Sequence, residues 1–335
     1  MLYMRQVSIG SIKLTDPVCL APMAGFSSLP FRIMCKRYGS SYAPTELASA
    51  RSIRFSGIDK SFRYMRIDPD KEGICAIQLF GTDPEDFREA VFAIDKDPRL
   101  TGVSIIDINM GCPVPKVVKT GSGSFLMTDP KLAASIVRAC KEAIRDIGRD
   151  IPVTVKTRTG FEAGDKGVPE LARAVASEGC DMLCVHGRTR PQMYSGEADI
   201  EAIAVMREAV KSFDIPFFAN GDIKDGRSAL NMLEQTGADG LMVGRAARGD
   251  PMVFERIRKE MAGETFTPPS DSIRKELLME ELIGRTGYLR EDVAVREMRS
   301  VMPFYVKGME GAAMLKTALC RCTSVDEVRE VLELD

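Results

Sequence analysis

The sequence has no long apolar run and no strong imbalance of charge. A membrane-spanning helix needs ~18 or more consecutive apolar residues, and no run in these 335 residues approaches that length. The first residues, M-L-Y-M-R-Q-V, lack the basic start and long apolar stretch of a signal peptide. Because 44% of the residues are apolar and 28% are charged, we expect a soluble globular enzyme with no membrane partner.

The cysteines show no pattern of a disulfide framework or a metal site. There are nine of them, an odd number, and they are scattered along the chain. Cys320 and Cys322 form a C-x-C pair that has no matching second pair, which argues against a zinc site. We therefore expect no metal and a reducing, cytoplasmic location.

The net charge of −2 argues against a protein that attracts nucleic acid through bulk positive charge. The last part of the chain, residues 251–335, carries more acidic than basic side chains. An RNA partner would therefore have to meet a local basic patch, and composition alone does not predict one.

Apolar segments alternate with amphipathic helical segments, which is typical of a parallel sheet with crossover helices. The predicted strands are 18–21, 41–44, 74–80, 104–109, 153–156, 182–186, 216–219 and 240–243. The predicted helices between them include 30–38, 84–95, 130–146, 168–178, 201–211 and 226–236. Eight such units in about 250 residues match a (β/α)₈ TIM barrel. The alternative is a doubly wound sheet, but no G-x-G-x-x-G follows the first strand.

After Pro251 the pattern contains only helices, and Pro268-Pro269 marks a linker. The predicted helices there are 272–285, 290–305, 312–320 and 324–334. Ser324 followed by Glu327 is a capping-box signature for the last of them. We predict an α/β TIM-barrel catalytic domain over residues 1–255 and a small all-helical domain over residues 256–335.

Polar residues follow the predicted strands at their carboxyl ends, where TIM-barrel enzymes build their active sites. The strand 104–109 ends in Asn109 and is followed by G-C-P, which contains the thiol of Cys112. A buried structural cysteine is the alternative, but the position at a strand exit favours a reactive thiol. The other strands end at Pro22-Met23, Glu46, Gln78, Lys156 with Arg158, His186 with Arg188, Asn220-Gly221-Asp222 and Gly244-Arg245.

Glycines follow the last two strands, at Gly221 and Gly244. TIM barrels commonly bind a phosphate on backbone N–H groups at this position. Two ordinary turns are the alternative, since glycine is common in turns. We favour the phosphate because both glycines stand where it is expected.

Lys156 and Arg158 supply positive charge at the end of the fifth strand, suited to stabilising an anion. A lysine that only reaches water is the alternative. His186, the only histidine, is as compatible with a structural role as with a ligand contact. A phosphate site, a central cation and the amides of Gln78 and Asn220 together suit flavin mononucleotide (FMN).

The motifs, taken in order, resemble those of the tRNA-dihydrouridine synthases. The G-C-P loop together with H-G-R-T-R-x-Q-x-Y-x-G is the most specific part. The resemblance covers residues 14–260, and R-E-M-R (296–299) with Y-V-K-G (305–308) extends it into the helical part. The segments are A-P-M-A-G-F-S (21–27), T-E-L-A-S-A-R (45–51), Q-L-F-G (78–81), D-I-N-M-G-C-P (107–113), V-K-T-R-T-G (155–160), H-G-R-T-R-P-Q-M-Y-S-G (186–196), A-N-G-D-I (219–223) and V-G-R-A (243–246).

The resemblance implies an FMN enzyme that reduces the 5,6 double bond of particular uridines in tRNA, using NADPH or NADH. Cys112 would donate a proton to C5, and Asn109 would help orient the uracil. The implied FMN contacts are Pro22, Met23, Ala24, Gln78, Lys156, His186, Asn220, Gly221, Asp222, Gly244 and Arg245. At the barrel mouth we expect tRNA phosphates to meet Arg158, Arg188, Arg190 and Lys116. The helical part offers Arg296, Arg299 and Lys307, for which a solvated helix face is an equally good alternative because this part of the chain is net acidic.

The chain departs from the family pattern in the loop after Cys112, where Ser124 and Phe125 replace common alanines, and Ala48 replaces a commoner larger residue. A thiol suits the proton donor, because its ordinary pKa of ~8.5 keeps it protonated at neutral pH yet acidic enough to donate.

Two other functions stay open. One is an FMN-barrel oxidoreductase acting on a free pyrimidine or enone. The other is a non-catalytic tRNA-binding protein, which the presence of both Cys112 and Lys156 argues against. We expect a monomer.

Overall fold

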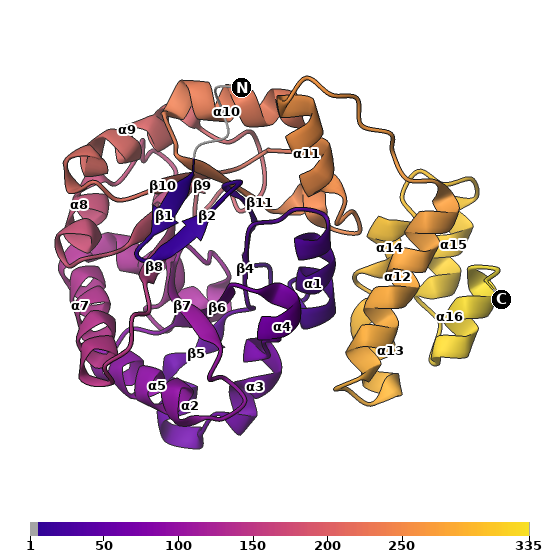
Figure 1. Ribbon diagram of the computed structural model, residues 1–335, viewed down its shortest axis with the longest axis horizontal. Helices are drawn as coiled ribbons and strands as arrows, with labels where there is room; N and C mark the ends of the chain where they lie inside the picture. The colour runs from indigo at the N-terminus through magenta and orange to yellow at the C-terminus, as the bar shows by residue number, and fades with distance from the viewer. Residues whose placement is uncertain (1–5, 335) are drawn as a thin grey trace.

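The computed structural model describes residues 6–334 and shows a barrel of parallel strands beside a bundle of helices (Figure 1). Its strands pair in the order β3-β11-β10-β9-β8-β7-β6-β4. Backbone hydrogen bonds join β3 to the segment that leads into β4, from Leu20 N to Tyr42 O (3.1 Å) and from Ser41 N to Val18 O (3.0 Å). They close the ring and confirm the predicted TIM barrel. The strands are β3 (Val18–Leu20), β4 (Ala43–Pro44), β6 (Cys75–Phe80), β7 (Val103–Met110), β8 (Val153–Gly160), β9 (Met182–Thr189), β10 (Phe217–Asn220) and β11 (Gly240–Val243).

Amphipathic helices surround the strands (Figure 1). In α7, Ala133, Ile136, Val137 and Cys140 recur at helical spacing and are buried against the sheet. Asp129 caps its first turn by accepting from Leu132 N, and Pro130 follows at the first helical position. The surrounding helices are α1 (Leu29–Arg37), α5 (Pro84–Lys96), α7 (Pro130–Asp146), α8 (Pro169–Ser177), α9 (Ile200–Val210) and α10 (Gly226–Thr236).

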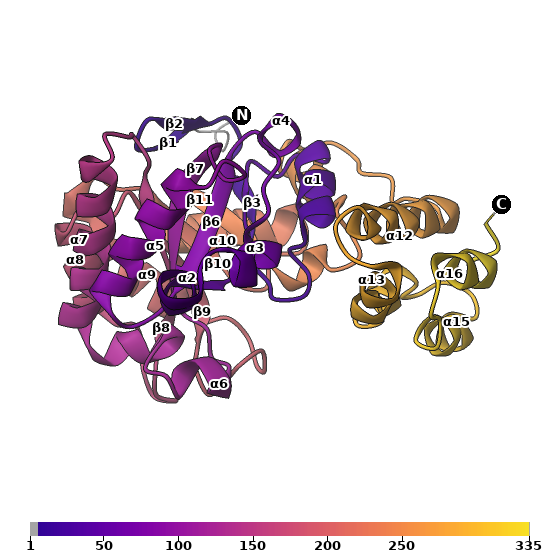
Figure 2. The same cartoon turned by 90° about the horizontal axis from the view of Figure 1, so that it is seen from below.

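A hairpin that the sequence pattern did not predict covers the amino end of the barrel. Its strands, β1 (Val7–Ile9) and β2 (Ile12–Leu14), pair antiparallel. Ile9 and Leu14 are buried and belong to one apolar cluster with inward-facing strand residues such as Ile105 and Phe218. Figure 2 shows the hairpin at one end of the barrel and α6 (Pro115–Val118), which follows β7, at the other. The amino end is therefore closed by side chains.

Other short elements lie outside the regular strand–helix alternation. Between β4 and β6 the chain forms β5, which pairs with β6, and three helices. They are β5 (Ala48–Ser49), α2 (Ala50–Ser56), α3 (Asp59–Met65) and α4 (Pro69–Glu72). Three 3₁₀ turns are η1 (Gly123–Thr128), η2 (Lys211–Phe213) and η3 (Arg245–Ala247).

The helical C-terminal region is present beside the barrel, as predicted (Figure 1). Helix α11 (Val253–Met261) runs across residue 255, and its Phe254 and Ile257 belong to the core of the barrel. The predicted helix 290–305 consists of two helices, because the backbone turns at 299–301. The remaining helices are α12 (Asp271–Thr286), α13 (Glu291–Met298), α14 (Met302–Tyr305), α15 (Ala312–Leu319) and α16 (Val325–Val331).

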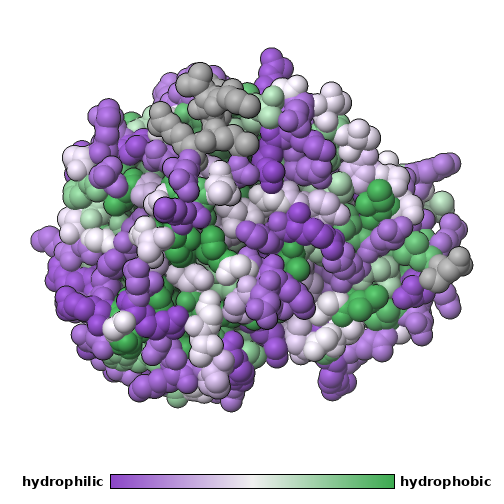
Figure 3. Space-filling view, in the orientation of Figure 1, coloured by the Kyte–Doolittle hydropathy of each residue, from purple (hydrophilic) through white to green (hydrophobic). Residues whose placement is uncertain are grey.

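The helical part has its own apolar core, in which Leu278, Val295 and Tyr305 are fully buried. Ser324 caps α16 by accepting from Glu327 N. On the face shown in Figure 3 most of the surface is hydrophilic, with small separate hydrophobic areas. Within residues 6–334, no helix has the length and apolar character needed to cross a membrane. Residues 1–5, part of the segment on which the signal-peptide argument rests, lie outside the described residues.

Candidate active site

A cavity of about 750 Å³ lies at the carboxyl ends of the strands. Its volume falls within the range of about 300–1,000 Å³ that is usual for small-molecule and cofactor sites. Cys112 and every residue predicted to contact FMN line this cavity. Asn109, Arg158 and Arg188 line it too, whereas Arg190 does not. These predicted site residues, except Arg190, therefore lie together in one cavity, and their individual roles stay predictions.

Lys156 lines the cavity from β8. Its ammonium donates to Asn220 Oδ1 at 3.0 Å, and Asn220 Nδ2 donates to the Met242 carbonyl at 2.7 Å. Burial lowers the pKa of Lys156. His186 is next to this group on β9, and burial together with the charges of Lys156 and Arg158 lowers its pKa well below the ordinary value. The imidazole is therefore neutral at pH 7.

A chain of hydrogen bonds runs from the barrel interior to Cys112. Asp107 is fully buried and accepts from Thr154 Oγ1 and from Gln78 Nε2, the latter at 2.6 Å. Gln78 Oε1 in turn accepts from Asn109 Nδ2 at 2.9 Å, and Asn109 Oδ1 accepts from Cys112 N at 2.9 Å. Because the Asp107 carboxylate can only accept, it holds the Gln78 amide with its nitrogen towards Asp107 and its oxygen towards Asn109. Asn109 in turn has its nitrogen towards Gln78 and its oxygen towards Cys112 N. Burial raises the pKa of Asp107 to about 6, against the bonds that lower it.

Sequence reasoning did not single out Asp107 as a site residue. The available signal was an acidic residue inside the apolar strand V-S-I-I-D-I-N, where a carboxylate needs a dedicated partner.

The loop that carries Cys112 is closely packed on both sides. A Cβ at Gly111 would lie 2.9 Å from the backbone of Thr157, and one at Gly123 would lie 2.8 Å from the Cys112 carbonyl. Ser124 N donates to that carbonyl at 3.0 Å. Ser124, one of the three residues that depart from the family pattern, therefore supports the loop through its backbone. Burial raises the pKa of the Cys112 thiol, so the thiol is protonated at neutral pH.

Arg188 is engaged within the protein. It is 1% exposed and donates to both carboxylate oxygens of Asp222, at 3.0 and 2.8 Å. Arg245 also donates to Asp222, and so does the backbone N–H of Ala198. Burial opposes the charge of Asp222, but these donors outweigh it and hold its pKa below the ordinary value. Arg188 and Arg245 therefore fasten the loops after β9, β10 and β11 to one another.

The other predicted tRNA contacts fall into different surroundings. Arg158 Nε donates to the Gly111 carbonyl at 2.9 Å, which ties the Cys112 loop to the barrel. Arg190 lies outside the cavity, with its guanidinium 4.2 Å from the ring centre of Phe161. Lys116 is exposed on α6. In the helical part, Arg299 donates to the Cys322 carbonyl (2.8 Å), whereas Lys307 lines the cavity and Arg296 lines a second one.

The groups at the end of β10 and β11 fit a phosphate-bearing flavin. At Gly221, where φ is +134°, a Cβ would lie 2.7 Å from Ala198, so only glycine is accommodated. A Cβ at Gly244 would find nothing nearer than Ala21 at 3.8 Å, which leaves the backbone open to a ligand. The turn η3 begins at the next residue, and the first N–H groups of such a turn have no partner within it. Within residues 6–334, no three His, Cys, Asp or Glu side chains are grouped to hold a metal.

The family model described as dihydrouridine synthase (Dus) matches residues 19–335. The chain belongs to the dihydrouridine synthase family. It is 36% identical over 322 residues to tRNA-dihydrouridine synthase B of Xanthomonas axonopodis pv. citri, covering 96% of this chain and 92% of that protein. It is 37% identical over 314 residues to a probable tRNA-dihydrouridine synthase of Rickettsia conorii, covering 93% and 91%.

Two solved structures share the fold of this dihydrouridine synthase family member at low sequence identity. Histamine dehydrogenase from Rhizobium sp. 4-9 matches with a TM-score of 0.59 and 14% identity, over 90% of this chain and 51% of that one. A 2-naphthoyl-CoA reductase matches with a TM-score of 0.55 and 10% identity, over 78% and 52%. The chain spans about half the length of each, and the likeness shows the barrel fold alone.

Proposed function

We propose that this chain reduces the C5=C6 bond of particular uridines in tRNA, with FMN as cofactor and NADPH or NADH as reductant. The observation that carries the proposal is the meeting of the Cys112 thiol and the Lys156 ammonium in one cavity. The chain that places them there matches relatives named tRNA-dihydrouridine synthases over 96% and 93% of its length.

The cavity offers groups suited to each part of FMN. Gln78 and Lys156 would hold the ring system, with His186 close by, and Pro22, Met23 and Ala24 would pack against it. Asn220, Gly221, Asp222, Gly244 and Arg245 would hold the ribityl phosphate side. Bound FMN supplies the hydride that C6 of the uracil receives.

Cys112 completes the reduction by donating a proton to C5. Addition of hydride at C6 leaves negative charge over C5 and the C4 carbonyl, so a positioned acid must deliver the proton. Burial keeps the thiol protonated at neutral pH, whereas a serine hydroxyl in its place would be too weak an acid. Asn109, held by Gln78 and by Cys112 N, would orient the uracil.

The substrate must enter the cavity as an unstacked base. A uridine within folded tRNA cannot reach the barrel interior, and extruding it costs a few kcal/mol. We assign FMN binding to the barrel and tRNA binding to the helical part. Lys307 supports this division, because it brings a cation of the helical part to the cavity wall. We further propose a monomer in the cytoplasm.

The test is anaerobic NADPH oxidation by the purified flavoprotein with and without unmodified tRNA, followed by dihydrouridine analysis of that tRNA. We expect flavin reoxidation that requires tRNA and leaves dihydrouridine in it. Reoxidation that is indifferent to tRNA, with no dihydrouridine formed, would refute the proposal and indicate a small-molecule substrate.

A further inference from the structure

A second cavity, of about 380 Å³, lies between the barrel and the helical part. On the barrel side its walls come from the loops after β3 and β4, from α1 and from the end of α3. On the other side they come from α12, α13 and the loop between them. Ala24 lines both this cavity and the active-site cavity, so the two are neighbours. We call the second one the seam cavity.

The seam cavity has more positive than negative groups. Two carboxylates face it, those of Glu46 and Glu297, against five guanidinium groups. Three of the arginines pair with a carboxylate: Arg32 with Glu72 and Arg285 with Glu281, each at 2.7 Å, and Arg63 with Glu297. Across residues 6–334, Arg66 and Arg296 have no carboxylate within ion-pair distance. Within the same residues Glu46 also has no cation partner, so with Glu72 and Glu281 included the five guanidinium groups exceed the carboxylates around the seam cavity by one positive charge.

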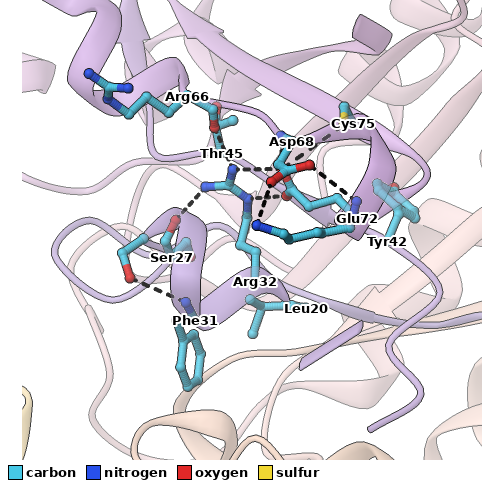
Figure 4. Close-up of polar contacts among 12 residues, drawn as sticks. Leu20, Ser27, Phe31, Arg32, Tyr42, Thr45, Arg66, Asp68, Glu72 and Cys75 are labelled. Atoms are coloured by element: carbon cyan, nitrogen blue, oxygen red, sulfur yellow. Dashed lines mark hydrogen bonds and ion pairs between the residues drawn. The ribbon is translucent and has the colours of Figure 1, made fainter. Parts of the chain in front are cut away.

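Arg66 is held in a fixed orientation although its charge is unpaired. Figure 4 shows its side chain extending away from the Arg32–Glu72 pair, while its backbone carbonyl accepts from Arg32. Its guanidinium lies 4.6 Å from the ring centre of Phe62 and 4.9 Å from that of Tyr288, one ring from each part of the molecule. Arg66 Nε is buried and has no hydrogen-bond partner. Burial also lowers the pKa of Arg66. An anion in the cavity would accept a hydrogen bond from Arg66 Nε and would stabilise the partly buried positive charge.

The chemistry of these groups points to a phosphate. Guanidinium presents a planar fork of donors that matches phosphate oxygens. Arg296 is exposed on α13 and faces the same cavity from the helical part. A tRNA that places a uridine in the active-site cavity must lay its neighbouring nucleotides over adjacent surface. Because the chain has a net charge of only −2, phosphates need a local cationic site rather than a general field.

We propose that the seam cavity binds a backbone phosphate of tRNA beside the target uridine, with Arg66 and Arg296 as donors. The inference rests on the proposed function, in which tRNA is the substrate. It gives the seam cavity the role of binding the RNA backbone. Since Arg66 belongs to the barrel side and Arg296 to α13, the phosphate would bridge them.

The test uses the FMN-loaded full chain and the variants Arg296→Gln and Arg66→Met. Arg321→Gln is the matched control, because Arg321 is an exposed cation of the helical part that lines neither cavity. The tRNA dissociation constant is measured at several salt concentrations. For each of the two cavity variants we expect about tenfold weaker binding and a salt dependence that is shallower by about one counterion. The control should bind like the unmodified chain.

The same variants distinguish the possible sources of the phosphate. We expect FMN content and the rate of flavin reduction by NADPH to stay unchanged. Slower reduction by NADPH with unchanged tRNA binding would overturn the proposal in favour of a site for the nicotinamide nucleotide. Unchanged binding in Arg296→Gln would overturn it as well, and this exposed position tests the site even if Arg66→Met fails to fold. Failure of the unmodified chain to form dihydrouridine would instead refute the proposed function.

Discussion

The two ends of the barrel are built from the same strands, yet one is filled with apolar side chains and the other opens into a polar cavity. Successive inward-facing residues of one strand are two positions apart. On β7, Ile105 belongs to the apolar cluster at the amino end, Asp107 lies in the buried chain of hydrogen bonds, and Asn109 lines the cavity at the carboxyl end. On β10, Phe218 is followed by Asn220 in the same way. Along these two strands, the residues that fill the apolar core and the residues that line the cavity are therefore separate.

The largest expected effect on activity comes from a change at the carboxyl end of the barrel, at Cys112. Cys112→Ala should reduce dihydrouridine formation by about 10²–10⁴-fold, the usual contribution of a general acid. Flavin content and thermal stability should stay unchanged, because the residue is only half-buried. The measurement is dihydrouridine formed in one anaerobic turnover on unmodified tRNA. Cys320→Ala, at an exposed cysteine, is the control, and full turnover by Cys112→Ala would remove Cys112 from the mechanism.

A change at the apolar amino end of the barrel should instead lower stability and leave activity unchanged. Leu14→Ala in the hairpin removes a side chain that is 1% exposed and should lower the free energy of unfolding by about 2–4 kcal/mol. Activity per folded molecule should not change, since Leu14 lies in the apolar cluster and not in the cavity. Denaturant unfolding measures the loss, with exposed Lys13→Ala on the same strand as control. A loss of activity without a loss of stability would contradict the separation of the two ends.

A smaller effect is expected at Asp107, midway between the ends. Its pKa of about 6 means that it is ionised at pH 7 and protonated below about pH 6. A proton on Oδ2 faces Gln78 Nε2, which cannot accept it, so the form protonated on this oxygen loses the bond that orders the amides. Activity should therefore fall about tenfold for each pH unit below 6. Asp107→Asn cannot gain this proton, and its profile should be flat over the same range.

Unfolding driven by the titration of Asp107 cannot account for that expected acid limb. The ordinary pKa of the Asp107 carboxyl is 3.8, so between that value and about 6 the folded state binds more protons than the unfolded state. The contribution of Asp107 to stability therefore increases as the pH falls from 6 to 4. Thermal unfolding of both proteins at pH 5 and 7 checks this sign, and an acid limb retained in Asp107→Asn would assign it to another group.

The parts of the fold that were predictable from the sequence are those with strong local patterns. The strands are β-branched apolar runs, and Asp-Pro pairs mark the starts of α5 and α7. The hairpin β1–β2 escaped prediction because each strand has three residues and a polar centre, Ser8 or Lys13. Helix α11 crosses residue 255 because its apolar face fits the barrel, which only the assembled core shows.

The site was predictable in membership and less so in its contacts. Strand ends and family motifs placed Cys112 and Lys156 in one cavity. That Arg188 is taken up by Asp222, 34 positions away, depends on how the loops fold together. Arg296 was expected to contact tRNA, but the seam cavity itself was not predictable, because Arg66 and Arg296 line one cavity only when the helical part packs beside α3.

The contacts between the first barrel loop and α12 can form only late in synthesis of the chain. Ser28 Oγ donates to Glu281 at 3.0 Å, and Arg285 donates to the Gly25 carbonyl at 3.1 Å, across 253 and 260 positions of sequence. A ribosome adds about 5–20 residues per second, so the loop waits roughly 13–50 seconds for these partners. The wall beside Met23 and Ala24 is therefore among the first segments to leave the ribosome, yet it is completed only after α12 has been synthesised. In a nascent chain that stops before α12, the first barrel loop lacks both of these partners.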